Sequence, residues 1–169
     1  MKGELEFKSD ALDFGTLYDM LLFERDKAMD TYIVLSDDKV ISKMSLKGQK
    51  MKRPKATDEY KTILSEMKED AEANGKIMCS PEDWKVANDM IDRLQATGLI
   101  GEFLSSQNYQ VEFLEDIGGV KVKGFLDCLG DGFIVDSKST KSVDKFRYSV
   151  RDVSYDIQAY IYTTVFGID

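Results

Sequence analysis

The chain has 169 residues, of which 43% are hydrophobic and 32% charged, and its formal net charge is −8. This length and composition predict a single globular domain over residues 1–169 with a sizeable core, and they exclude a disordered chain. The acidic balance argues against a nonspecific nucleic-acid coat, because such a protein has to be basic.

The residue inventory narrows the possible chemistry. The sequence contains no histidine, which excludes Ser-His-Asp catalysis and zinc sites built on imidazole. Any metal has to be held by carboxylates and carbonyls, which favour Mg²⁺ or Mn²⁺. The two cysteines, Cys79 and Cys128, form no Cys-x-x-Cys motif, so we expect reduced core thiols. With neither a signal-peptide pattern nor an apolar run of about 18 residues, the sequence predicts a cytoplasmic protein without membrane association.

Helices are expected to dominate the first half of the chain. Residues 9–25 show a helical apolar stripe that includes Leu17 and Leu21. A short strand is expected at 30–35, because this segment is rich in strand-forming residues. Residues 36–56 combine weak periodicity with many lysines, which predicts a loop.

Two further helices carry clear signals at their ends. Residues 57–75 begin at a Thr-Asp capping pair and stop at an Asn-Gly pair. Residues 80–98 begin at Ser80, which has a proline after it and a capping-box partner in Asp83, and they end at a glycine. A short helix is expected next, over 99–106.

The second half of the sequence predicts a β-meander closed by a helix. Residues 108–116 and 119–129 alternate in polarity around Gly118-Gly119, which is a hairpin turn signal. Residues 132–139 give a third strand, and 154–167 give the closing helix. This order of elements predicts an α/β or α+β fold with an antiparallel sheet flanked by helices.

Chemically useful residues gather around the third strand. Acid-x-Lys triplets occur six times, but only Asp136-x-Lys138 follows a strand-like apolar run and lies downstream of a Gly-x-x-Asp, which ends at Asp127. Residues two apart on a strand share a face, and the antiparallel neighbour brings Asp127 beside them. Clustered carboxylates repel each other unless a cation lies between them, so a divalent ion fits. Lys138 would orient or help deprotonate the attacking water; the rival interpretation is a surface ion pair at an exposed strand end.

Three motifs resemble the core of the PD-(D/E)XK nucleases. They are Gly124-Phe-Leu-Asp127, Asp136-Ser-Lys138-Ser-Thr140 and Tyr155-x-x-Gln158-x-x-x-Tyr162. The order is similar to that in the exonuclease VIII (RecE) type of phage and prophage recombination exonucleases, which are relatives of lambda exonuclease. Residues 11–24 also resemble the early helix of that family, whose pattern is Gly-Thr-Ala-hydrophobic-His. The likeness extends from about Ala11 to Phe166.

The resemblance implies a restriction-endonuclease-like α/β core, with a mixed central sheet, an antiparallel meander and flanking helices. Asp127 and Asp136 would ligate Mg²⁺ or Mn²⁺, and the main-chain carbonyl of Ser137 would complete the inner shell. Lys138 would serve the attacking water, and Glu112 would add a further acidic group to the site.

Other residues are implied in contacts with DNA. Gln158 and Tyr162 lie one helical turn apart and would touch the DNA strand or order the active site. The rival interpretation for both is an ordinary helix surface packed on the sheet. Arg53 lies in the lysine-rich stretch 47–55, where the family tends to place an arginine, and would contact a phosphate. For the lysines around it, a solvated loop is the equal alternative.

At two positions the sequence departs from the family pattern, and at a third it leaves the choice of residue undecided. The early helix has Tyr18 where the family has a histidine near the metal, and a phenol is a poor ligand for Mg²⁺. The family's Asp-x-Lys-Thr has serine in place of threonine. The register of the strand at 108–116 leaves Glu115 as a rival to Glu112.

The resemblance therefore implies a Mg²⁺-dependent deoxyribonuclease that hydrolyses DNA phosphodiester bonds. By analogy with the family, it would digest double-stranded DNA ends from 5′ to 3′ in phage-type recombination and leave single strands for an annealing protein. A homo-oligomeric ring around the DNA is expected on the same analogy. The alternatives are an endonuclease or single-strand nuclease on the same fold, and a catalytically inactive DNA-binding or assembly module.

Overall fold

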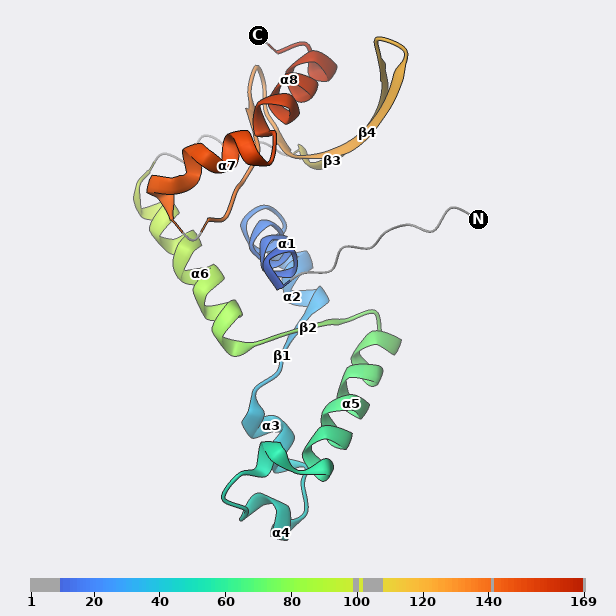
Figure 1. Ribbon diagram of the computed structural model, residues 1–169, viewed down its shortest axis with the longest axis vertical. Helices are drawn as coiled ribbons and strands as arrows, with labels where there is room; N and C mark the ends of the chain where they lie inside the picture. The colour runs from blue at the N-terminus through green and yellow to red at the C-terminus, as the bar shows by residue number, and fades with distance from the viewer. Residues whose placement is uncertain (1–9, 99–100, 102–107, 141, 169) are drawn as a thin grey trace.

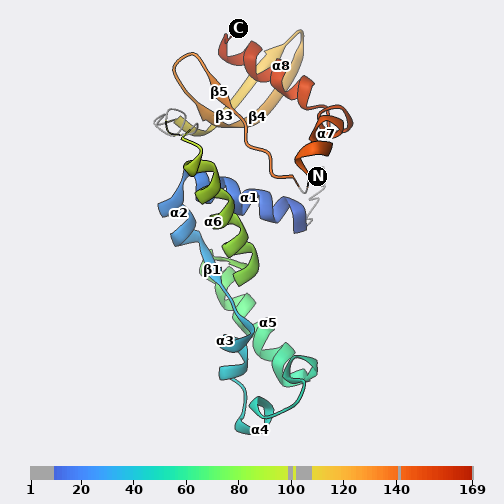
Figure 2. The ribbon, with the colours of Figure 1, turned by 90° about the vertical axis from the view of Figure 1, so that its left-hand side faces the viewer.

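The molecule has three parts that follow one another along its long axis (Figure 1). A computed structural model describes residues 10–98, 101, 108–140 and 142–168 of the chain. A sheet with the C-terminal helices forms one end, a layer of helices forms the middle, and a small helical lobe forms the other end (Figure 2). The helix expected over 99–106 falls outside the described residues, except for Gly101.

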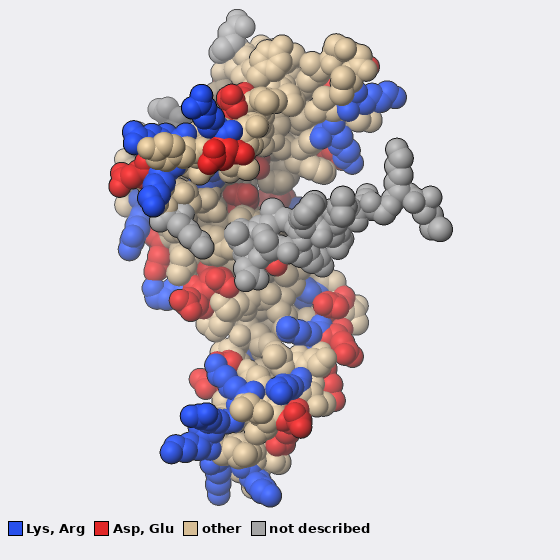
Figure 3. Space-filling model, in the orientation of Figure 1, with Lys and Arg blue, Asp and Glu red and all other residues tan. Residues whose placement is uncertain are grey.

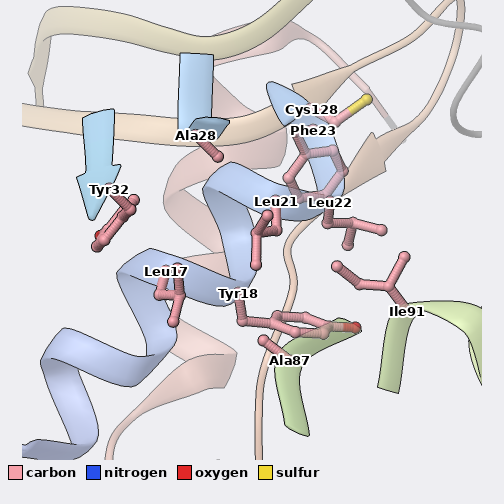
Figure 4. Packing of buried hydrophobic residues seen from close by; sticks show 10 residues of the cluster. All are labelled: Leu17, Tyr18, Leu21, Leu22, Phe23, Ala28, Tyr32, Ala87, Ile91 and Cys128. Carbon is pink, nitrogen blue, oxygen red and sulfur yellow. The ribbon is translucent and has the colours of Figure 1, made fainter. Parts of the chain in front are cut away.

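The middle layer consists of α1 (Asp10–Phe23), α2 (Arg25–Thr31) and α6 (Pro81–Ala96). The apolar stripe expected on the first helix is confirmed, since Leu17 and Leu21 are only 2% and 1% exposed. These side chains pack with Ala87 and Ile91 of α6 in the largest hydrophobic cluster (Figure 4). The helix α2 is an addition to the expected elements, and it continues the chain after a break at Glu24.

The expected ends of two helices are also confirmed. At the start of α6, Ser80 Oγ accepts a hydrogen bond from the N–H of Asp83 at 2.9 Å and donates one to its Oδ2 at 2.7 Å, which is a side-chain variant of the capping box. At the start of α5 (Asp58–Ala73), Thr57 Oγ1 accepts from the N–H of Tyr60. After α5, Gly75 takes the left-handed conformation with φ of 65°, which ends the helix.

The stretch 36–56, expected to be a loop, is a helical lobe instead. It contains α3 (Asp37–Ser42), α4 (Leu46–Gln49) and the 3₁₀ helix η1 (Pro54–Ala56). Val40 and Met44 of this stretch pack against Tyr60 of α5 in a small core of their own. The loop prediction was wrong because helices of four to six residues depend on such tertiary packing and leave little periodicity in the sequence.

A short parallel ladder joins the lobe to the middle layer. It pairs β1 (Tyr32–Val34) with β2 (Ile77–Cys79), in the register Tyr32 to Ile77. The strand expected at 30–35 is thus confirmed in its centre, whereas β2 is absent from the sequence prediction. Three residues between two helices are too few to show a strand periodicity.

The antiparallel sheet has the order β3–β4–β5, with β3 at Asn108–Ile117, β4 at Val120–Leu129 and β5 at Ile134–Val135. The hairpin prediction is confirmed, because Gly118 and Gly119 both have positive φ and Ile117 pairs with Val120. The closing helix, α8 (Tyr155–Phe166), covers one face of this sheet. A three-stranded antiparallel sheet flanked by helices confirms the expected fold class.

The third strand is much shorter than the expected 132–139. Beyond Val135 the chain leaves the ladder, and the N–H of Ser137 donates to the side chain of Asp127 rather than to a strand neighbour. A 3₁₀ helix, η3 (Val143–Lys145), and α7 (Phe146–Asp152) follow before α8. Within the described part of the chain, no helix has the length and apolar character needed to span a membrane.

Candidate active site

Three segments far apart in the sequence bring their acidic residues to one place. Asp19 lies on α1, Asp127 on β4 and Asp136 directly after β5. The buried cluster around α1 includes Cys128, which is 0% exposed and holds this end of β4 against the helix. The electrostatic influence of Asp127 and Asp136 on Asp19 reflects this proximity. The sequence prediction for Asp127 and Asp136 therefore holds in position, and the structure adds Asp19.

Asp136 and Lys138 form an ion pair on a common face, as the spacing of two residues predicts. Each side chain is only 22% exposed. The Lys138 ammonium also lies 5.1 Å from the ring centre of Tyr155, the first residue of α8. Burial alone would lower the pKa of Lys138, but the hydrogen bond and charge of Asp136 outweigh it, and the pKa is raised. Lys138 is therefore a cation at neutral pH, suited to orienting groups rather than removing protons.

Asp127 is held from two sides. Its Oδ2 accepts a hydrogen bond from the backbone N–H of Ser137 at 2.7 Å, and its carboxylate is also hydrogen-bonded by the side chain of Gln110. Burial raises the pKa of Asp127, and the negative charge of Asp136 raises it further. A carboxylate with this environment gains from any cation that approaches it.

Gln110 is a site residue that sequence reasoning missed. The ladder pairs Tyr109 with Cys128 and Val111 with Leu126, which puts Gln110 opposite Asp127. Its backbone has φ of 49°, in the left-handed region that a non-glycine residue rarely adopts. Strain of this kind persists where the surroundings hold a side chain in a required position.

Asp19 is the most perturbed acid in the site. Burial and the negative charge of Asp127 raise the pKa of Asp19 to about 7, although the side chain of Ser137 donates a hydrogen bond to it. A signal for this residue was present in the sequence. The family pattern Gly-Thr-Ala-hydrophobic-His, counted from Gly15, puts its fifth position at Asp19 and not at Tyr18. Counted in this way, the resemblance implies a carboxylate in the place of the histidine.

Tyr18 has a structural position. Its side chain is 6% exposed and its ring packs near Ala87 and Ile91 of α6 (Figure 4). Burial and the charge of Asp19 raise the pKa of the Tyr18 phenol, which keeps it neutral. Its hydroxyl is hydrogen-bonded to the side chain of Ser137, so it supports the segment that carries Asp136.

Gln158 and Tyr162 form two consecutive hydrogen bonds that link α8 to β4, and we refer to this pair of bonds as the relay. The Gln158 amide donates to the Tyr162 hydroxyl at 2.7 Å, and this hydroxyl donates to the main-chain carbonyl of Phe125 at 2.8 Å. Tyr162 is 7% exposed. Phe125 lies two residues before Asp127, so the relay fixes the strand that carries the acid. Of the two roles expected for these residues, this geometry favours ordering the active site.

The structure does not bring the remaining predicted residues to the three aspartates. Glu112 is exposed and forms an ion pair with Lys123 at 2.6 Å. Glu115 is also exposed, farther along β3 toward the hairpin turn. Arg53 precedes η1 and belongs to the lobe, at the opposite end of the molecule from the sheet (Figure 2).

The donor set suits a hard divalent cation. Asp19, Asp127 and Asp136 supply carboxylate oxygens in a half-buried position, which is the chemistry that Mg²⁺ and Mn²⁺ prefer. Like charges raise the pKa values of Asp19 and Asp127, and a bound cation would offset that repulsion. As it stands, no group of three or more acidic or thiol side chains among the described residues is close enough to hold an ion.

Comparison with known proteins identifies the kind of domain. A family model described as a PDDEXK-like domain of unknown function (DUF3799) matches residues 1–168, which is nearly the whole chain. The comparison with curated proteins and the comparison with solved structures each gave no match. The matched range includes every residue of the site described above.

Proposed function

This chain belongs to the PDDEXK-like family DUF3799, and we propose that it is a metal-dependent deoxyribonuclease that hydrolyses phosphodiester bonds. The observation that carries the proposal is the convergence of Asp19, Asp127 and Asp136 on one half-buried place beside the cation Lys138. Half-buried like charges that lie close together are unfavourable in a domain with only a structural role, so their presence supports a function in binding a cation.

In the proposed site Asp127 and Asp136 hold the ion, Asp19 is the third carboxylate, and the main-chain carbonyl of Ser137 is a further oxygen donor. Mg²⁺ or Mn²⁺ supplies Lewis-acid activation of water and neutralises charge on the scissile phosphate. The raised pKa of Asp19 has a direct consequence for binding, because the carboxyl must lose its proton before it can act as a ligand.

Lys138 is the second group to which we assign a role in the proposed hydrolysis. Its ammonium is held by Asp136 and lies over the ring of Tyr155, so it has a fixed position next to the carboxylates. As a permanent cation it donates hydrogen bonds to a water or to a non-bridging phosphate oxygen, where negative charge develops during hydrolysis. The raised pKa argues against Lys138 as the base that removes the proton from water.

The resemblance to the exonuclease VIII (RecE) type supports a finer proposal. The substrate would be the end of double-stranded DNA, digested from 5′ to 3′ in phage-type recombination. A single-strand annealing protein would take over the exposed strand, and a homo-oligomeric ring would hold the duplex. Mg²⁺ would be the natural ion, and the cytoplasm the site of action.

A panel of DNA substrates tests this proposal. The panel contains a 5′-phosphorylated linear duplex labelled at either end, a covalently closed circle and a single strand, each with Mg²⁺, Mn²⁺ or EDTA. The proposal expects metal-dependent loss of the linear duplex, with early release of the 5′ label and an intact circle. Cutting of the circle would establish an endonuclease, and preference for the single strand a single-strand nuclease. Binding without cleavage in either metal would leave an inactive DNA-binding module.

A further inference from the structure

The charge of the chain is unevenly distributed. The lobe residues 36–56 contain seven Lys or Arg and two Asp, which is a net charge of +5 within a protein of net charge −8. The rest of the chain therefore carries −13. Figure 3 shows basic side chains gathered over the end of the molecule that α3 and α4 form. A polyanion approaching this protein is attracted to that end and repelled by most other surfaces.

Most of these cations have no charged partner within the described part of the chain. Five of them are exposed and make no ion pair with the described residues: Lys43, Lys47, Lys50, Lys52 and Arg53. We refer to these five as the lobe cations. Exposed cations that are not neutralised internally remain available for a ligand.

Two acidic side chains, Asp37 and Glu59, stabilise the lobe through contacts within the protein. Asp37 accepts a 2.6 Å hydrogen bond from the hydroxyl of Tyr60 and forms an ion pair with Lys55. Glu59 accepts from the backbone N–H and the hydroxyl of Ser45, at 2.6 and 3.2 Å, and thereby holds the start of α4 against α5. The anions thus hold the lobe together, while the lobe cations face the solvent.

Nucleic-acid phosphate fits this surface better than a lipid headgroup does. Of the lobe cations only Lys47 lies within a helix, the four-residue α4, whereas Lys43 follows α3 and the other three lie between α4 and η1. A membrane-surface helix typically presents a continuous apolar face, whereas Leu46 and Met51 are the only exposed large apolar side chains within residues 36–56. Several separate exposed cations can each contact one of the repeated phosphate charges of a DNA backbone.

The length of the molecule specifies the kind of nucleic acid. α5 has 16 residues and connects the lobe with β2, so it spans about 24 Å. The aspartates lie where the sheet meets α1 of the middle layer, on the side of β1 and β2 away from the lobe (Figure 1). A ligand that contacts both places must extend over more than about seven base pairs of duplex DNA, at about 3.4 Å per pair.

We propose that the lobe is a second DNA-binding surface, which holds the backbone of a duplex whose reacting end lies at the aspartates. This inference rests on the proposed nuclease function and names the part of the chain that grips the substrate away from the reaction. The lobe cations would contribute affinity without sequence preference, because phosphate contacts do not read bases.

Fluorescence anisotropy of labelled DNA tests the proposal in EDTA, with the full chain carrying Asp136→Ala so that no cleavage interferes. The lobe variant is Lys47→Gln/Lys50→Gln/Lys52→Gln. The matched control is Lys27→Gln/Lys68→Gln/Lys85→Gln, which makes the same change in net charge at exposed lysines elsewhere. The probes are a long duplex, a hairpin with a stem of about six base pairs that is too short to reach the lobe, and vesicles of phosphatidylserine and phosphatidylcholine.

For the long duplex, the lobe variant should bind at least tenfold more weakly than the control, and its salt dependence, as log K against log salt, should be shallower by about 2 to 3. The short hairpin should show no such difference. Equal binding of the long duplex by the two variants would overturn the proposal, and so would a lysine-dependent preference for the vesicles. Because cleavage is not measured, a loss of binding in the lobe variant would support the lobe even if the wild-type chain proved unable to cut DNA.

Discussion

The backbone N–H of Ser137 donates a 2.7 Å hydrogen bond to Oδ2 of Asp127. The bond replaces the next rung of the ladder between β4 and β5, and it turns the chain so that Asp136 and Lys138 lie beside Asp127. The same serine holds Asp19 through its side chain. One residue thus connects the three segments of the site.

Replacing Asp127 by Asn should abolish cleavage and preserve the fold. An amide oxygen can still accept the hydrogen bond from Ser137, but it lacks the charge that a divalent cation needs. We expect cleavage to fall by more than about 100-fold, since even the hydrogen-bond partners of metal ligands contribute 10- to 100-fold. The thermal midpoint should stay the same or rise, because a charge repulsion is removed. The control is Asp131→Asn in the exposed turn after β4, and cleavage at the wild-type rate by Asp127→Asn would contradict the assignment.

The raised pKa of Asp19 predicts a pH-dependent stability of the metal-free protein. The folded state binds this proton more tightly than the unfolded state, since its pKa is about 7 instead of the ordinary 3.8. The free energy of unfolding should therefore fall as the pH rises from about 4 to 7, and stay reduced above that. After discounting for partial exposure to solvent, the loss is on the order of 2 kcal/mol.

Urea unfolding in EDTA measures this effect. At pH 8, Asp19→Asn should be more stable than the wild type, whereas at pH 4 the two should agree. The control Asp13→Asn lies on the same helix at an exposed position and should follow the wild type. Added Mg²⁺ should restore the stability of the wild type at pH 8 and stabilise Asp19→Asn less, because that variant keeps Asp127 and Asp136 but lacks the third carboxylate. A difference between Asp19→Asn and the wild type that does not change with pH would show that the carboxyl is not titrating in this range.

Lys138→Gln should separate chemistry from metal binding. Removal of the ammonium frees the Asp136 carboxylate from its internal ion pair, so the affinity for Mn²⁺ should stay the same or increase. The cleavage rate at saturating metal should nevertheless fall by at least about tenfold, because a donor aimed at developing charge is lost. The exposed Lys145→Gln serves as the control. Weaker metal binding with an unchanged rate at saturation would assign Lys138 a different role.

Tyr162→Phe tests the relay from α8 to β4. The change removes the hydroxyl that donates to the main-chain carbonyl of Phe125 and accepts from Gln158, and both hydrogen bonds are partly buried, so we expect a cost of about 1 kcal/mol in the free energy of unfolding. The cleavage rate should fall as well, because the strand next to Asp127 becomes less rigid. Tyr160→Phe is a matched control on the same helix, since Tyr160 is 65% exposed. Equal stability of the two variants in urea would show that the relay does not hold the strand.

Sequence patterns predict those elements whose signals are local. The capping box of Ser80 and Asp83, and the hairpin at Gly118-Gly119, depend on neighbouring residues alone, and both appear as expected. The lobe was missed for the opposite reason. Its helices α3 and α4 depend on contacts with Tyr60 and Glu59 of α5, which are distant in sequence.

The residues of the candidate site also fall into two groups: those that local spacing predicts, and those that only the tertiary packing brings together. Asp136 and Lys138 are two residues apart on one segment, and that spacing predicted that they lie together, as their ion pair shows, although the segment leaves the strand after Val135. Asp19 and Gln110 reach Asp127 only through the packing of α1 and the register of β3, which no local pattern contains. For Asp19 the family pattern did hold a signal, but a shift of one residue assigned it to the buried Tyr18.

The most direct test of a metal-dependent nuclease at this site is the release of acid-soluble nucleotide from a linear duplex. The wild type and Asp136→Ala are compared with Mg²⁺, with Mn²⁺ and with EDTA. Our account predicts release by the wild type in either metal, none in EDTA, and none by Asp136→Ala under any condition. Release that continues in EDTA, or at an equal rate in Asp136→Ala, would contradict the assignment of the three aspartates as the reaction centre.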